Sequence, residues 1–234
     1  MFNTLKKIVV FLLLGAVGFL GFTSKVFSEP ISSDLLDTIK QNSVSIYYQS
    51  SKSFGSYFED SPKRQFLTYG SGVVIRTDSS GSYILTNYHV VANGFKFRIK
   101  DSFGSYFKGS KIVFDKVKDL ALLKVTDSKI GKETKFSQAD RLSIGDRLYS
   151  IGNPKGYSGS FYQGYVSYLG RSTRDFKNLI QLDMNLEEGS SGSGVFNSEG
   201  ELVGLIVGID GRISFAINSE DIQRFLRQSE ERLR

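Results

Sequence analysis

The chain has 234 residues, and it contains no cysteine, no tryptophan and a single histidine, His89. These counts exclude a disulfide scaffold, iron–sulfur ligation and histidine-rich zinc sites, so we expect no metal and no other cofactor. The formal charge is +6, but residues 1–28 hold three lysines and no acid, so the remainder carries 27 basic against 24 acidic side chains. That near balance, with no strand pair on which basic and aromatic residues gather, argues against nucleic acid as a partner.

The first segment is predicted to be an export signal or a membrane anchor. Lys6 and Lys7 precede an apolar run over residues 8–22, and Val26 and Ser28 occupy positions suited to signal-peptide cleavage after Ser28. At 15 residues the run is shorter than the ~20 residues that a membrane span needs, which favours cleavage. We therefore expect an exported protein, periplasmic or secreted after cleavage, or else membrane-anchored through residues 8–22.

The rest of the chain is predicted to be all-β with a helix at each end. A capped amphipathic helix is predicted to begin at Ser33. Asn218 is followed by acidic residues and then by apolar residues on one face, which predicts a C-terminal helix. Between them, short runs separated by turn residues, without helical crossovers, are typical of antiparallel barrels or sandwiches. The expected strands cover residues 44–48, 72–77, 83–86, 95–99, 120–125, 147–151, 161–169, 179–184, 195–196, 202–207 and 212–217.

These strands fall into two halves. The apolar pattern lapses over residues 127–140, where a linker is predicted, so the halves cover residues 29–126 and 127–234. One hexapeptide, Ser-Phe-Gly-Ser-Tyr-Phe, occurs at 53–58 and again at 102–107, without a third copy that would indicate a solenoid. We expect both copies to form aromatic-rich hairpin loops.

His89 and Asp119 both stand at the ends of predicted strands. His89 follows the apolar strand 83–86 and precedes Val90, which places it beside a buried wall. Asp119 opens the apolar run 120–125, where a carboxylate needs a hydrogen-bond donor, and an imidazole N–H is a suitable one. Taken singly, His89 would be an ordinary interior or surface residue and Asp119 a turn residue.

A Gly/Ser loop supplies a third element. Glycines on either side of Ser191 let the backbone turn sharply and direct its N–H groups inward. Such N–H groups can stabilise an oxyanion, while a serine hydroxyl that a base has deprotonated attacks a carbonyl. Composition alone favours a flexible linker, but the loop is short and lies between apolar strands. His89, Asp119 and Ser191, in this order along the chain, therefore all indicate one mechanism, attack on a carbonyl by a serine that a base activates.

With these residues in place, the chain resembles the chymotrypsin-fold serine endopeptidases, and most of all the protease domain of the HtrA (DegP-like) family. The resemblance covers roughly residues 70–217. Each matching segment is weak, but the ordered set is specific. The segments are residues 70–75, 85–91, 119–125, 151–154, 180–183, 189–192, 200–205 and 214–217.

The resemblance implies two six-stranded antiparallel β-barrels with an active site between them. Residues 29–126 would form the N-terminal barrel with its leading helix, and residues 127–234 the C-terminal barrel with the terminal helix. His89 would be the general base, Asp119 would orient it, and Ser191 would be the nucleophile. The backbone N–H groups of Gly189 and Ser191 would form the oxyanion hole.

The resemblance also suggests how a polypeptide substrate is held. Ser214, Phe215 and Ala216 resemble a strand that pairs with the substrate backbone and borders the specificity pocket. Asn185 resembles the residue at the base of that pocket, and an uncharged side chain there favours small or medium aliphatic residues over Arg or Lys. Relatives commonly assemble as trimers through N-terminal aromatic contacts, but residues 29–69 do not match that region, so a homo-oligomer is left as an open alternative.

Several residues depart from the family pattern. Ser190 stands where HtrA proteases usually have Asn, and Ser193 replaces a usual Gly, which makes Ser193 the rival nucleophile. Glu187 and Glu188 precede the oxyanion loop, where inward-pointing carboxylates would oppose negative charge. These departures motivate the alternative that the chain is a catalytically inactive binding or adhesion module. Since the chain ends at Arg234, we also expect no PDZ domain.

Overall fold

The computed structural model describes residues 30–50, 68–126, 128–138, 141–211 and 213–233. The predicted leader 1–28 and the first hexapeptide copy at 53–58 lie outside the described residues. Residues Ser33–Arg234 form one compact unit. The description below concerns that unit.

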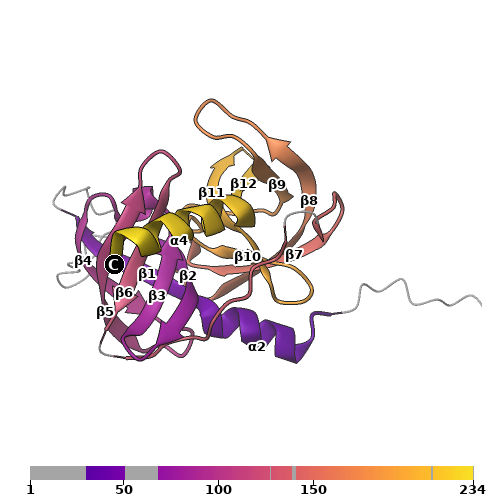
Figure 1. Ribbon diagram of the computed structural model, residues 1–234. Helices are drawn as coiled ribbons and strands as arrows, with labels where there is room; N and C mark the ends of the chain where they lie inside the picture. Colours follow the sequence, from indigo (N-terminus) through magenta and orange to yellow (C-terminus); the bar gives the residue numbers. More distant parts are fainter. Residues whose placement is uncertain (1–29, 51–67, 127, 139–140, 212, 234) are drawn as a thin grey trace, which may run out of the picture. The chain divides into compact units, whose positions relative to one another are not determined.

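The strands of this unit form two closed antiparallel barrels of six strands each, which confirms the predicted fold class (Figure 1). The order around the first barrel is β1-β2-β3-β6-β5-β4, and around the second it is β10-β11-β12-β9-β8-β7. The first barrel consists of β1 (Ser43–Ser50), β2 (Thr68–Asp78), β3 (Gly81–Thr86), β4 (Gly94–Lys100), β5 (Tyr106–Asp115) and β6 (Leu120–Val125). The second consists of β7 (Arg147–Gly152), β8 (Ser160–Arg171), β9 (Leu179–Asp183), β10 (Gly194–Phe196), β11 (Leu202–Asp210) and β12 (Ile213–Asn218).

Each barrel encloses its own apolar core. The first is filled by aliphatic side chains of neighbouring strands, among them Ile46, Ile84 and Leu123, which are fully buried. In the second barrel, Leu148 and Ile206 are equally buried. Since successive strand residues face opposite sides of the sheet, these inward positions alternate with outward ones, and burial of the inward set stabilises the barrels.

The C-terminal helix α4 (Ser219–Leu233) forms as the sequence predicts. The side-chain oxygen of Asn218 accepts a hydrogen bond from the backbone N–H of Asp221 at 2.9 Å, which satisfies a donor of the first turn. Ile222 and Phe225 are buried, and the helix packs against β11 and β12 of the second barrel.

The linker between the barrels bonds to both of them. The backbone N–H of Thr134 donates to the carbonyl of Ile75 in the first barrel at 3.3 Å, and the next residue, Lys135, accepts from Leu202 of the second at 2.7 Å. Helix α2 (Ser33–Asn42) ends against the same linker, because the side-chain amide of Asn42 donates to the Thr134 hydroxyl at 2.8 Å. These bonds fix the two barrels side by side.

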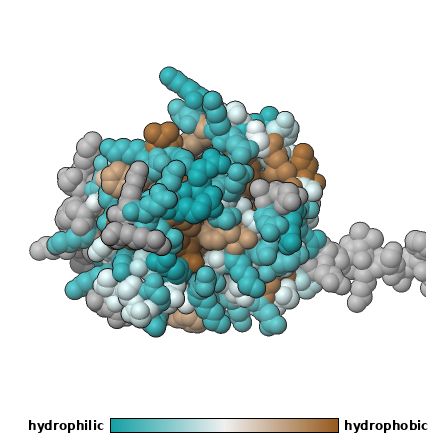
Figure 2. All heavy atoms as spheres, viewed as in Figure 1, coloured by the Kyte–Doolittle hydropathy of each residue, from teal (hydrophilic) through white to brown (hydrophobic). Residues whose placement is uncertain are grey.

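One face of the surface is seen in Figure 2. Figure 2 shows hydrophilic side chains over most of the viewed face, with hydrophobic ones confined to small areas. Within the described ranges, no helix combines the length and hydropathy that crossing a lipid bilayer requires.

Candidate active site

His89 and Asp119 meet where the first barrel ends. β3 and β6 are paired, with Thr86 opposite Ala121, so the end of β3 lies beside the start of β6. Helix α3 (Tyr88–Val91) follows β3 and carries His89, while Asp119 directly precedes β6. Nδ1 of His89 lies 2.6 Å from Oδ2 of Asp119, and the backbone N–H of His89 donates to Oδ1 at 2.8 Å. The carboxylate therefore holds both the ring and the backbone of His89.

This contact fixes which ring nitrogen carries the proton. An ionised carboxylate can only accept, so Nδ1 is the donor and Nε2 keeps a free lone pair. Asp119 is 6% exposed, and its carbonyl accepts from the backbone N–H of Tyr88 at 3.2 Å and the Asn87 amide at 3.1 Å. The His89 side chain is 49% exposed. A base accessible to solvent is thus oriented by a buried acid.

The Gly/Ser loop consists of two consecutive β-turns. The backbone N–H of Ser190 donates to the carbonyl of Glu187, and that of Ser193 donates to the carbonyl of Ser190, both at 3.0 Å. The third residue of each turn is a glycine, Gly189 with φ +95° and Gly192 with φ +87°. Type II turns need positive φ at this position. A Cβ at either glycine would also collide with a neighbouring carbonyl oxygen, so glycine is required twice over.

The turns leave two N–H groups unused. Those of Gly189 and Ser191 donate to no acceptor among the described residues. The carbonyl of Glu188 accepts from the backbone N–H of Lys155 at 2.7 Å, and the carbonyl of Ser190 is bonded within the second turn. The N–H and C=O groups of a trans peptide point in opposite directions. The bonded carbonyls of Glu188 and Ser190 therefore direct the N–H groups of Gly189 and Ser191 away from the donors that these carbonyls bind. The two free donors could bind an oxyanion.

Ser71 of β2 clamps this loop to the first barrel. Its hydroxyl donates to the carbonyl of Gly189 at 2.8 Å and accepts from the backbone N–H of Asn153 at 2.9 Å. Its own backbone N–H donates to the carbonyl of Ser191 at 2.9 Å. Ser71 is fully buried, so these bonds are shielded from water.

We expect Ser71→Ala to weaken both the fold and the loop. Removing the hydroxyl leaves the Asn153 N–H and the Gly189 carbonyl unsatisfied, which costs about 1–3 kcal/mol of unfolding free energy. A loop displaced by an ångström should also lower the reactivity of the site by roughly tenfold to a hundredfold. Urea unfolding and the rate of labelling by a fluorophosphonate measure the two effects.

Ser82→Ala is the matched control. Ser82 is also fully buried, and its hydroxyl donates to the carbonyl of Ile130 at 2.9 Å and accepts from the N–H of the same residue at 2.8 Å. It should lose comparable stability and keep its labelling rate. Equal labelling losses in both variants would show that Ser71 has no special part in holding the loop.

Ser191 lies at the same end of β3 as His89. The next residue, Gly192, packs so closely that a Cβ there would be 2.5 Å from the hydroxyl oxygen of Thr86, the last residue of β3. The described hydrogen bonds include none between the His89 ring and the Ser191 hydroxyl. Such bonds are often long without substrate and tighten in the complex.

The rival serine is enclosed. Ser191 is partly exposed, whereas Ser193 is 1% exposed and its hydroxyl faces Gly152 so closely that a Cβ there would collide with it. The Ser193 hydroxyl has no hydrogen-bond partner among the described residues. A substrate can therefore reach Ser191 and not Ser193.

The two glutamates before the loop point to solvent. Both are exposed, and Oε2 of Glu187 lies 3.1 Å from Nζ of Lys155. Glu188 lies close enough to Tyr69 that its charge adds to the effect of burial in raising the pKa of that phenol, while Lys155 lowers it. Pairing and solvent screening weaken their repulsion of an oxyanion.

The structure does not leave residues 214–216 free for a substrate. Ser214, Phe215 and Ala216 pair with β11 on one side and with β9 on the other, so β12 has no open edge here. The hydroxyl of Ser214 is buried and donates to the carbonyl of Met184 at 3.0 Å. The expected pairing of this segment with a substrate backbone is therefore wrong.

Asn185 does not have the surroundings of a pocket floor. Its side chain is exposed, while its neighbours Met184 and Leu186 are the buried ones. The segment lies beyond the end of β9 at Asp183 and directs Asn185 outward between these two buried residues. The expected place of Asn185 at the base of a pocket is not what the structure shows.

An open edge lies instead on β11. β10 pairs with β11 only as far as Leu205, and Ile206 exchanges backbone hydrogen bonds with Gly192 and Ser193 of the loop, both 2.9 Å long. From Gly208 to Asp210, the described residues pair with β11 on the β12 side only. An unpaired edge therefore begins beside the loop that carries Ser191.

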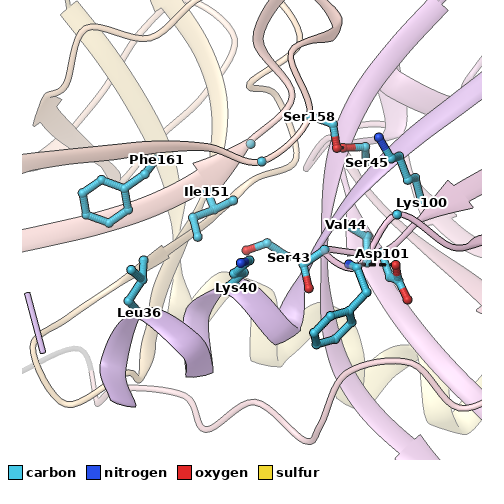
Figure 3. Close-up of a pocket in the computed structure, with 15 residues that line it drawn as sticks. Leu36, Lys40, Ser43, Val44, Ser45, Lys100, Asp101, Ile151, Ser158 and Phe161 are labelled. Atoms are coloured by element: carbon cyan, nitrogen blue, oxygen red, sulfur yellow. Dashed lines mark hydrogen bonds between the residues drawn. The ribbon is translucent and has the colours of Figure 1, made fainter. Parts of the chain in front are cut away.

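A hollow of about 420 Å³ lies between the barrels, away from the predicted site residues. Figure 3 shows its walls: Leu36 and Lys40 come from α2, Ile151 and Phe161 from the second barrel, and the Ser45 and Ser158 hydroxyls meet at its edge, 2.8 Å apart. None of the predicted site residues lines it.

Sequence reasoning missed Ser71 and Lys155, which bond to the loop from distant segments, and Asn153, whose backbone N–H bonds to the Ser71 hydroxyl. No local pattern marks a residue for such a contact; only their place in family-like segments could have drawn attention to them. Among the described residues, no group of three or more His, Asp or Glu side chains could hold a metal ion.

Comparison with known proteins identifies the family of the chain. The chain matches the trypsin-like peptidase domain over residues 70–205. It is 35% identical to a probable periplasmic serine protease do/HhoA-like of Haemophilus influenzae over 71% of this chain and 37% of the relative. It is 33% identical to the periplasmic serine endoprotease DegP of Salmonella typhimurium (76% and 42%) and 35% identical to the periplasmic pH-dependent serine endoprotease DegQ of Escherichia coli (66% and 34%).

The chain thus spans about two fifths of the length of these curated relatives. The match to the peptidase domain covers more than half of the chain and contains His89, Asp119 and Ser191. The chain therefore belongs to the trypsin-like peptidase family, with homology to the DegP and HtrA serine proteases.

Proposed function

We propose that the protein is an exported serine endopeptidase in which His89, Asp119 and Ser191 form the catalytic triad. The observation that carries this proposal is the His89–Asp119 pair, 2.6 Å apart, at the barrel end where the loop of Ser191 leaves two backbone N–H groups unused. Gly189 is buried, and a purely structural loop would satisfy its N–H group, since unpaired buried N–H groups are costly. The availability of the two N–H groups favours an oxyanion hole.

The reaction follows from these positions. Nε2 of His89 takes the hydroxyl proton of Ser191 as Oγ bonds to the substrate carbonyl carbon, and the N–H groups of Gly189 and Ser191 stabilise the oxyanion. The protonated ring then donates that proton to the leaving amine as the C–N bond breaks. A water molecule then gives a proton to the same nitrogen as its oxygen bonds to the acyl carbon, and the ring returns this proton to Oγ of Ser191 as the ester C–O bond breaks.

The substrate class is an extended polypeptide. The unpaired edge of β11 from Gly208 to Asp210 could bond to a substrate main chain, which lets recognition depend little on side chains. Export rests on the predicted signal, with cleavage near Ser28 favoured over an anchor formed by residues 8–22. The periplasmic location named for the relatives supports export, and assembly into a homo-oligomer belongs to the same proposal.

Active-site labelling tests this proposal. We expect a fluorophosphonate to modify the chain from Pro30 onward, and peptide mapping to place the adduct on Ser191. An adduct on Ser193 would contradict the assignment. No adduct under any condition, with the fold intact, would favour the catalytically inactive binding or adhesion module.

A further inference from the structure

We propose that the outer face of β4 and β5 is a docking surface for an anionic lipid membrane. We call this surface the basic strip and define it by six residues whose side chains face outward. They are Tyr47, Lys96, Arg98, Lys100, Tyr106 and Lys108. This inference is independent of the catalytic proposal.

Strand pairing brings the cations of the basic strip together. Lys96, Arg98 and Lys100 occupy alternate positions of β4 and so share one face, and Arg98 lies directly opposite Lys108 on β5. Tyr106 lies opposite Lys100, and its ring is 4.4 Å from the Arg98 guanidinium carbon. Basic and aromatic residues therefore do gather on one strand pair, contrary to the expectation from the sequence.

The stability of the fold explains only part of the basic strip, namely the contacts of Arg98 and Lys100 with the Tyr106 ring. Like charges directly opposite each other on paired strands are destabilising, and Arg98 and Lys108 have this arrangement. The ion pairs of the described residues include none with Lys96, Lys100 or Lys108. Lysines often protect the edge of an open sheet, but this barrel is closed through the β1–β4 pair. An anionic partner accounts for what folding does not.

The adjoining hairpin tip favours a membrane as that partner. Phe103 is 77% exposed and Tyr106 is 50% exposed. The carboxylate of Asp101 accepts the backbone N–H groups of Phe103 and Ser105 at 2.9 and 2.8 Å, which orders the turn and engages the nearest acid. An apolar tip beside cations and tyrosines suits the boundary between lipid headgroups and acyl chains.

The predicted export segment supports the same partner. Whether residues 8–22 are cleaved or retained, they direct the chain to a membrane during export. Residues 29–234 are nearly balanced in charge, so attraction to lipid would come from the local cluster and not from the net charge. Binding should therefore depend on where cations are placed.

Vesicle sedimentation tests the proposal. The chain from Pro30 onward contains the whole compact unit and lacks the apolar run, which would itself partition into lipid. We expect it to bind vesicles of phosphatidylcholine mixed with phosphatidylglycerol, to bind pure phosphatidylcholine far less, and to be released by salt. The double variant K96E/K108E should bind the anionic vesicles at least about tenfold more weakly.

Two controls separate the basic strip from net charge and from misfolding. R174E/K177E makes the same charge change at exposed positions between β8 and β9, and it should retain binding. K108E alone places a carboxylate opposite Arg98, so its melting temperature should not fall while its binding does. Absence of binding by the unaltered chain, or equal losses in the two double variants, would overturn the proposal. Tighter binding to an oligonucleotide than to vesicles, lost in K96E/K108E, would assign the strip to nucleic acid instead.

Discussion

Replacing Ser191 with alanine is expected to lower peptide hydrolysis by roughly 10⁵- to 10⁶-fold and to abolish fluorophosphonate labelling. The hydroxyl is the side-chain group of Ser191 that attacks the substrate, and the partial exposure of Ser191 lets a substrate carbonyl approach it. The backbone of residue 191 accepts from the Ser71 N–H through its carbonyl, and alanine keeps this bond. The loop should therefore stay in place while the nucleophile is lost. Initial rates on an unfolded casein measure the effect.

Ser193→Ala is the matched control for that change. The hydroxyl of Ser193 is buried without a partner among the described residues, so its removal should leave stability unchanged or slightly raised. Labelling and hydrolysis should persist. If Ser193→Ala removed activity and Ser191→Ala did not, the roles of the two serines would be exchanged.

Much of the fold could be predicted from local pattern. The runs that became β3 and β6 are almost continuously apolar and are buried on both sides, and the acidic first turn after Asn218 marks α4. β5 was missed because its outward positions are Lys, Ser and Tyr and its inward ones include Gly109. A strand that carries a docking face is less apolar than its neighbours, and for that reason it is harder to recognise.

The second hexapeptide copy follows the expectation from the sequence. Residues 102–107 form the turn between β4 and β5 and the start of β5, and Phe103 is the most exposed aromatic side chain among the large hydrophobic residues described. Local composition was sufficient here because a turn depends on a few neighbouring residues. Asn185 and Ser214 illustrate the opposite case.

The places of Asn185 and Ser214 depend on pairing between strands far apart in the chain. The substrate-binding roles that the family resemblance implies for these two residues do not fit the pairing, because β12 is paired on both sides and the free edge belongs to β11. The positions of His89 and Asp119 were easier to predict, because each residue lies at the end of an apolar strand and the two strands pair directly. Their contact follows from one pairing, whereas a substrate groove needs several.

Asp119→Asn should reduce hydrolysis by about 10⁴-fold with little change in stability. Asp119 has φ +54°, a conformation that asparagine tolerates as well as aspartate does, so the backbone need not move. The amide oxygen can still accept the backbone N–H of His89, which now bonds to Oδ1 at 2.8 Å. The amide nitrogen would then face Nδ1 as a donor, and the ring would have to place its proton on Nε2. A ring protonated there cannot accept the proton of Ser191.

Asp115→Asn provides the control for the loss of a carboxylate. Oδ1 of Asp115 accepts the backbone N–H groups of Val117 and Lys118 at 2.9 and 3.0 Å, and no histidine lies among its partners. Asp115→Asn makes the same change in charge at another carboxylate that accepts backbone N–H groups. The variant should hydrolyse substrate at the rate of the unaltered protein. Asp119→Ala should, in addition, lose about 1 kcal/mol of unfolding free energy, because alanine is strained at positive φ. If Asp119→Asn kept full activity, the 2.6 Å contact with Nδ1 would not control the protonation of the ring, and the triad assignment would fail at its acid.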